Sequence, residues 1–202
     1  MQTTPVPKSE IRNPALTVEA GLYILVGALA LAVRLFQLGR APLSMSEAQL
    51  ALAAYHGALP PAGSSPLLYS LDVILFAVLG SSDAVARLMP ALTGALLALL
   101  PAFLRRRLGQ IGALGAAAVL AISPVAGMAS RTASGDVIAA AAMMGLVIAF
   151  ERYERGRNIA WLYAGAAILG VGLTSSSIIY SAAFMLLIGA GLAALSDQTT
   201  AG

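Results

Sequence analysis

The chain alternates long apolar segments with short polar ones. Six of the apolar segments approach the roughly 20 residues that a helix needs to cross about 30 Å of hydrocarbon. Backbone polar groups in lipid must be satisfied within the spanning structure, so apolar runs of this length predict membrane-spanning helices. We therefore expect an all-α integral membrane protein with about six transmembrane helices. These predicted helices cover residues 16–38, 84–104, 110–129, 135–153, 159–175 and 177–195.

A seventh apolar segment, "PLLYSLDVILFAVLG" at residues 66–80, is predicted to lie along the membrane surface. As a helix, its 15 residues reach only about 22 Å. The segment also carries Asp72 near its middle, and a carboxylate is costly at the centre of a bilayer. We therefore expect one or two interfacial helices in a first outer loop that covers residues 39–83.

The basic residues predict the orientation of the chain. With six spans and the N-terminus inside, eight of the twelve Lys and Arg residues lie on the cytoplasmic side, as the positive-inside rule expects. Seven spans with the N-terminus outside would place the same eight inside, so charge alone leaves two topologies open. The shortness of segment 66–80 and its Asp72 favour six spans. The eight predicted inner residues are Lys8, Arg12, Arg105, Arg106, Arg107, Arg152, Arg155 and Arg157, and the four outer ones are Arg34, Arg40, Arg87 and Arg131.

Composition narrows the function classes. Hydrophobic residues make up 59% of the chain and charged residues only 10%, whereas soluble domains carry about 25% charged residues. The chain has no cysteine, which excludes disulfides, Cys-ligated metals and thiol nucleophiles. His56 is the single histidine, so no multi-histidine metal site forms within the chain. The lipid bilayer is the predicted partner, and the net charge of +3 gives no reason to expect nucleic acid.

The predicted organisation is a single transmembrane module with short polar ends. A polar cytoplasmic N-terminus covers residues 1–15, the module covers 16–195, and a polar tail covers 196–202. The module is expected in the cell (inner or plasma) membrane, with its N-terminus in the cytoplasm.

Three polar groups are predicted to lie on the outer side of the module. An acid and a base at one membrane surface would suit an enzyme that acts on a lipid-linked phosphate. The groups are the first loop with Ser46, Glu47 and His56, the turn "SRTASGD" at 130–136 with Arg131 and Asp136, and "LTSSS" at 173–177.

The order of these motifs resembles a known family. The series "RLFQLG", "PLSMSEA", "SPLLYSL", "FAVLGSSDAVARLMPAL", "LAISPVAGMASRTASGD", "ERYERGR" and "GVGLTSSS" is similar to the N-terminal transmembrane module of the GT-C membrane glycosyltransferases. These include the protein mannosyltransferases and the aminoarabinose transferases. The resemblance covers residues of about 30–180. It implies a cytoplasmic N-terminus and a large first outer loop with two juxtamembrane helices.

The resemblance also implies a chemistry, which is sugar transfer from a polyprenyl-phosphate donor at the outer surface. A first-loop carboxylate then acts as a base or a metal ligand, and an arginine in the next outer loop holds the donor phosphate in fork geometry. On this basis Glu47 and Asp136 are the candidate catalytic residues, and Arg131 and His56 are the candidate substrate-binding residues. A divalent metal is possible as a cofactor, but the sequence offers no complete ligand set.

The sequence departs from the family pattern at its polar anchors. The first-loop signature is usually Asp-Glu, and here Ser46 replaces the aspartate beside Glu47. Ser175 replaces a lysine, and only "GSS" precedes the proline at position 66, where relatives often carry a charged residue or histidine. A serine hydroxyl is too weak a base near neutral pH. Adjacent residues on a helix point about 100° apart, so the Glu47 carboxylate would not reach the position of the missing aspartate without movement.

Two interpretations stay open. In the first, the chain descends from polyprenyl-phosphate-sugar-dependent glycosyltransferases and is incomplete or non-catalytic by itself. In the second, it is a structural or assembly subunit of a larger membrane protein complex. A structural interpretation of single residues stays open as well, with Glu47 as a helix N-terminal acid capped by Ser44 or Ser46, and Arg131 and Asp136 as an interfacial pair. A channel or carrier is disfavoured, because the spans hold few ionisable residues.

Overall fold

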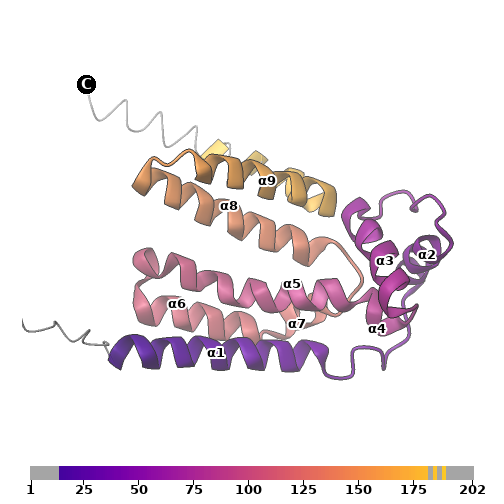
Figure 1. Ribbon diagram of the computed structural model, residues 1–202, viewed down its shortest axis with the longest axis horizontal. Coiled ribbons are helices and arrows are strands. Elements are labelled where there is room, and N and C mark those ends of the chain that lie inside the picture. The colour runs from indigo at the N-terminus through magenta and orange to yellow at the C-terminus, as the bar shows by residue number, and fades with distance from the viewer. Residues whose placement is uncertain (1–13, 182–183, 186–187, 190–202) are drawn as a thin grey trace, which may run out of the picture.

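The computed structural model describes residues 14–181, 184–185 and 188–189, and this part of the chain is helical without strands. Figure 1 shows helices lying side by side, with the helices of residues 45–86 gathered at one end. In chain order the elements are α1 (Pro14–Leu35), α2 (Met45–His56), α3 (Pro66–Leu79), α4 (Asp83–Ala86), α5 (Leu88–Leu99), the 3-10 helix η1 (Leu100–Leu104), α6 (Arg105–Ile122), α7 (Pro124–Ser130), α8 (Asp136–Gly156) and α9 (Ala160–Ser175).

The bundle consists of α1, α5, α6, α8 and α9, which run roughly along one axis (Figure 1). Helix α1 packs on α5 and α6, and α8 packs on α5 and α9. Small side chains fill the contact between α1, α5 and α6, where Ala30, Ala95, Ala98 and Ala121 form a buried cluster. Small residues let helix backbones approach closely, which is how helices associate in lipid.

Within the described residues, two segments are long and apolar enough to cross a membrane, residues 18–35 and 83–122. The second segment passes along the bundle twice, because its middle contacts the start of α1 whereas its last turn contacts the end of α1. Arg105 lies 3.3 Å from Glu19 near the start of α1, and Arg34 near the end of α1 donates to the Leu120 carbonyl. The chain therefore reverses between α5 and α6.

The expected all-helical class is confirmed for the described residues, but six membrane spans are not. The expected span 110–129 is divided, because α6 ends at Ile122 and α7 begins at Pro124. Proline has no backbone N–H and disfavours helical geometry in the residue before it, so the helix breaks there. The expected span 177–195 lies largely outside the described residues.

The segment expected at the membrane surface is α3. Together with α2 and α4 it lies beyond one end of the bundle, apart from the long helices (Figure 1). We call this the loop end. The opposite end, where α1 begins and α6 starts with three consecutive arginines, Arg105, Arg106 and Arg107, is called the arginine end.

Candidate functional site

The first turn of α2 fixes Glu47. Ser44 is the N-cap, and its hydroxyl accepts from the Glu47 N–H at 3.4 Å. The Glu47 carboxylate in return accepts from the Ser44 N–H at 2.8 Å. This reciprocal capping box satisfies two N–H groups that a helix start otherwise leaves unpaired. The residue spacing "SMSE" therefore sets both where α2 begins and which way Glu47 points.

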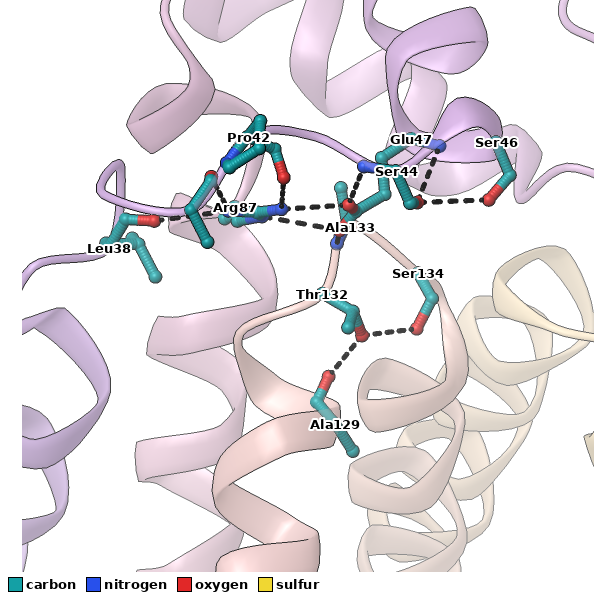
Figure 2. Close-up of polar contacts among 11 residues, drawn as sticks. Leu38, Pro42, Ser44, Ser46, Glu47, Arg87, Ala129, Thr132, Ala133 and Ser134 are labelled. Carbon is teal, nitrogen blue, oxygen red and sulfur yellow. Dashed lines mark hydrogen bonds and ion pairs between the residues drawn. The ribbon is translucent and has the colours of Figure 1, made fainter.

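Glu47 forms a buried ion pair with Arg87, as Figure 2 shows. The Arg87 Nη2 lies 2.9 Å from Oε2, and each side chain is only 7% exposed. The Arg87 Nε donates to Oε1 at 3.3 Å, and the Ala133 N–H donates to the same oxygen at 2.6 Å. Burial acts to raise the pKa of Glu47, but the hydrogen bonds from Arg87, Ser44 and Ala133 outweigh it and lower the pKa to about 2.

Arg87 also binds the chain that leaves α1. Its guanidinium donates to the carbonyls of Leu38, Ala41 and Pro42, the last two at 2.7 and 3.1 Å. One arginine therefore joins the α1–α2 connection, α2 and the start of α5, while Glu47 joins these to the turn before α8. The pair holds the loop end together.

A pocket of about 520 Å³ lies next to this ion pair, where the starts of α2, α3 and α8 meet the end of α9. Half of its described lining residues carry a hydroxyl group, one carries a carboxylate, and none of them is Lys or Arg. The polar lining side chains are Ser46, Ser64, Ser65, Ser134, Asp136, Ser175, Ser176, Ser177 and Tyr180.

Gly135 brings the walls of the pocket together. A Cβ at this position would lie 1.7 Å from the Ser175 carbonyl oxygen and 2.7 Å from the Ser65 hydroxyl. Only glycine therefore allows the turn before α8 to touch both the start of α3 and the end of α9. The Ser65 hydroxyl also approaches the Thr174 carbonyl, at 3.5 Å.

Asp136 is the first residue of α8 and accepts a hydrogen bond from the Ser176 hydroxyl at 2.7 Å. Negative charge is favourable at a helix N-terminus, and α8 has no side-chain cap at Gly135. The Asp136 carboxylate thus stabilises the N-terminus of α8 and also lines the pocket.

The sequence candidates separate into two groups. Ser46, Asp136 and Ser175 line the pocket. Glu47 does not, because it points from the other side of the α2 start toward Arg87 (Figure 2).

Arg131 and His56 also lie away from the pocket lining. Arg131 donates to the Phe36 and Gln37 carbonyls at 3.0 and 3.2 Å, just after the C-terminus of α1. It forms no ion pair with Asp136 in the described part of the chain. His56 ends α2 with an exposed side chain in edge-to-face contact with Tyr55.

No group of three or more His, Cys, Asp or Glu side chains gathers within the described ranges. The pocket brings one carboxylate, and Mg²⁺ and similar hard cations are usually held by one or two carboxylates together with substrate phosphates. The described lining residues alone therefore do not make up a metal site.

Besides Arg87, two further charged residues are buried at positions for which the sequence predicted no structural role, Arg34 and Asp72. Arg34 is 1% exposed, and its guanidinium donates to the Leu120 and Ala121 carbonyls, which Pro124 leaves without helical partners. A cation at a helix C-terminus is favourable. The signal was an arginine inside an apolar run, followed later by a proline that ends a helix.

Asp72 is the second buried charge. It is fully buried in α3, and both carboxylate oxygens lack a partner among the described residues. Burial raises the pKa of Asp72 to about 7. The sequence placed this residue at the membrane surface, but the structure encloses it between α3 and its neighbours.

The profile of the dolichyl-phosphate-mannose-protein mannosyltransferase family matches residues 64–200, about two thirds of the chain. The chain belongs to this family. The resemblance to GT-C transferases drawn from the motif series is therefore confirmed. The matched part includes Arg131, Asp136 and Ser175, and it begins after Ser46 and Glu47. Searches of curated proteins and of solved structures gave no match.

Proposed function

We propose that the chain is a membrane-embedded member of the mannosyltransferase family that holds the sugar of a polyprenyl-phosphate donor but does not complete the transfer by itself. The observation that carries this proposal is the loop-end pocket. It offers many hydroxyls and one carboxylate, and it has serine at position 46, where the family signature leads us to expect an acid.

The lining of the pocket suits a sugar better than a bare phosphate. Hydroxyls and a carboxylate can accept and donate hydrogen bonds to sugar hydroxyls. The negative charge of Asp136 would repel a phosphate, and no Lys or Arg among the described lining residues would compensate for it. We therefore place the sugar, and not the phosphate, against Ser46, Ser176 and Asp136.

The first-loop signature supplies no free base for the transfer step. Transfer to a hydroxyl acceptor needs a group that takes its proton, and the Ser46 hydroxyl is too weak for this. The Glu47 carboxylate is close in sequence, but Arg87 and the Ala133 N–H occupy its oxygens. Asp136 remains the candidate catalytic residue, and it stands without a second acid in the pocket lining.

The decisive experiment separates binding from turnover. The purified full chain is incubated with polyprenyl-phosphate-mannose and a serine- and threonine-containing peptide as acceptor, and both the bound donor and the mannose released to water or to the peptide are measured. We expect retention of donor without release of mannose. Asp136→Asn should weaken retention about tenfold, whereas Asp83→Asn, which removes a loop-end carboxylate outside this pocket, should not. Mannose release by the unmodified chain would overturn the non-catalytic part, and no donor retention would overturn the binding part.

The proposed topology has six spans, a cytoplasmic N-terminus and the loop end outside the cell. Charge supports it, because the arginines of the arginine end are mostly exposed, whereas Arg34 and Arg87 at the loop end are buried. The chain has no cysteine, so single cysteines report sidedness. On intact cells an impermeant maleimide should label Ser81→Cys, and it should label Asn158→Cys only after permeabilisation. The opposite pattern would reverse the orientation.

A second candidate function is that of a subunit in a larger membrane complex. Helices α6 and α9 carry glycines, Gly115 and Gly170, with open space beside them, and Ile111 next to this face of α6 is 90% exposed. Small residues on an outer face suit close helix packing. If this holds, Gly115→Ile should release a copurifying membrane protein, and Gly21→Ile on α1 should not. Isolation of the unmodified chain without any protein partner would count against it.

A further inference from the structure

The arginine end contains a second polar pocket, far from the loop-end site. It has a volume of about 470 Å³ and lies where α1, η1, α6 and α8 meet. Its polar walls come from Glu19 and Tyr23 of α1, Arg105 and Arg106 of α6, and Arg152 of α8. Its apolar walls come from Ala20, Ala102 and Phe103.

The pocket carries an excess of positive charge. Three arginines face one carboxylate, and that carboxylate, Glu19, pairs with Arg105 at 3.3 Å. Arg106 makes no side-chain hydrogen bond or ion pair within the described residues, and the Arg152 guanidinium lies over the Trp161 ring. The pocket therefore has a net charge of about +2, contributed by Arg106 and Arg152.

Neighbouring arginines at the same end are neutralised by acids. Arg107 lies 2.8 Å from Glu154, and Arg155 pairs with the buried Glu151. Among the described residues of this end, the unpaired charge is thus concentrated in the pocket, and Arg157, which lies over the Tyr153 ring, is the exception outside it.

An apolar groove continues from the pocket along the outside of the bundle. It lies between α1 and α5, has a volume of about 690 Å³, and shares Tyr23, Ala102 and Phe103 with the pocket. The remaining groove residues are apolar or glycine, among them Ile24, Leu31, Leu92 and Leu96. The Tyr23 hydroxyl lies buried at the junction and lacks a partner among the described residues.

We propose that this pocket and groove together bind one anionic phospholipid. The headgroup phosphate lies against Arg106 and Arg152, the Tyr23 hydroxyl donates to the headgroup or an ester oxygen, and one acyl chain fills the groove. Basic pockets between membrane helices are established binding places for anionic headgroups. The hydroxyl, the two arginines and the groove are joined in one continuous surface, as the parts of a phospholipid are.

The length of the groove favours a phospholipid over a long polyprenyl lipid. From Tyr23 to Leu31 the groove follows α1 for about 12 Å at 1.5 Å per residue. One leaflet of a bilayer has about 15 Å of hydrocarbon. The groove therefore matches an acyl chain that stays within its own leaflet.

The headgroup part is tested by lipid retention in native mass spectrometry. The full chain in mild detergent is titrated with dioleoylphosphatidylglycerol and, separately, with dioleoylphosphatidylcholine. We expect at least about tenfold stronger retention of the anionic lipid, with a decrease at high salt. Arg106→Gln should weaken that retention about fivefold. The matched control is Arg157→Gln, an exposed arginine at the same end but outside the pocket, which should leave retention unchanged.

The groove part is tested by filling it. Ala28→Phe places a ring in the groove, and it should weaken retention of phosphatidylglycerol about fivefold or more. Ala167→Phe makes the same change on the exposed face of α9 and should not. Thermal unfolding of each variant is measured in parallel, so that a loss of folding is recognised.

Five results would overturn the proposal. The first four are equal retention of the two phospholipids, an equal effect of Arg157→Gln, no effect of Ala28→Phe, and stronger retention of undecaprenyl phosphate than of phosphatidylglycerol. Glycerol phosphate is added as a soluble headgroup. If it displaces the lipid completely at equal concentration, the groove contributes nothing and the phospholipid assignment is wrong. None of these outcomes depends on the loop-end pocket.

Discussion

Two acids at the loop end, Glu47 and Asp136, have opposite surroundings. Glu47 is buried, with four hydrogen-bond donors from Arg87, Ser44 and Ala133 around its oxygens. Asp136 lies at the edge of an open pocket and accepts one recorded hydrogen bond, from Ser176. Both acids were candidate catalytic residues from the sequence, and the family match covers Asp136 but begins after Glu47.

The difference teaches that the direction in which a side chain leaves its helix decides whether it faces the pocket. Residues 46 and 47 are neighbours on a helix and point about 100° apart, so only one of them faces the pocket. That residue is Ser46. The retained Glu47 holds four segments of the chain together, and its loss would cost stability whether or not the protein catalyses a reaction.

The largest expected effect is that of Glu47→Gln on stability. Removal of the charge leaves Arg87 buried without its counter-ion, and breaking such a pair costs about 3–5 kcal/mol. Asp136→Asn should cost less than about 1 kcal/mol, because one partly exposed hydrogen bond contributes little. Denaturant unfolding of both variants in the same detergent measures the difference. Equal losses of unfolding free energy in the two variants would contradict the proposed difference between the two acids.

The pH dependence sharpens the same contrast. The folded pKa of Glu47 is about 2, below its ordinary value of 4.5, so the unfolded chain binds the proton first as the pH falls. The stability from Glu47 is therefore complete above about pH 5 and is lost as the pH falls toward 2, by about 3 kcal/mol. Thermal unfolding between pH 3 and 7 should show this slope in the unmodified chain and a shallower one in Glu47→Gln.

Gly135→Ala tests the wall of the pocket. The added Cβ would lie 1.7 Å from the Ser175 carbonyl oxygen, so the turn or the end of α9 must move, at a cost of about 1–3 kcal/mol. Gly127→Ala in α7 has open space and should be neutral or slightly stabilising. Unfolding midpoints compare the two, and a neutral Gly135→Ala would show that the walls are not tightly joined.

The smallest effect is expected for Ser176→Ala. It removes the hydrogen bond to Asp136 at the pocket rim, which contributes less than about 1 kcal/mol, but it frees the carboxylate to turn. Ser177→Ala also changes the pocket lining, without a recorded side-chain hydrogen bond, and is the control. Donor retention, measured as for Asp136→Asn, should change for Ser176→Ala and not for Ser177→Ala.

Much of the helical content could be predicted from the sequence, because the length and polarity of each apolar run depend only on residues within that run. Residues 66–80 were expected as a separate short helix, and α3 covers 66–79. The capping role of Ser44 was among the interpretations of the first loop, since Ser-x-x-Glu is a local signature. The break at Pro124 was readable in principle, yet the apolar run continued through it and concealed it.

The candidate site was predicted less completely, because its contacts join distant residues. Arg87 was counted only as an outer charge, and its pairing with Glu47 spans 40 residues. Arg131 was expected near Asp136, but it donates to the end of α1. A cation finds whichever carbonyl or carboxylate the packed helices bring near it, and a local sequence window does not contain that information.

The sequence by itself determined the helical class and the family, because apolar length and motif order are properties of the chain alone. Only the tertiary structure decided that Ser46 faces a pocket while Glu47 faces Arg87. It also decided that Gly135 joins three segments and that Arg106 and Arg152 share a cavity. These outcomes depend on the packing of helices against one another, since the contacts of a side chain depend on which other element lies next to it.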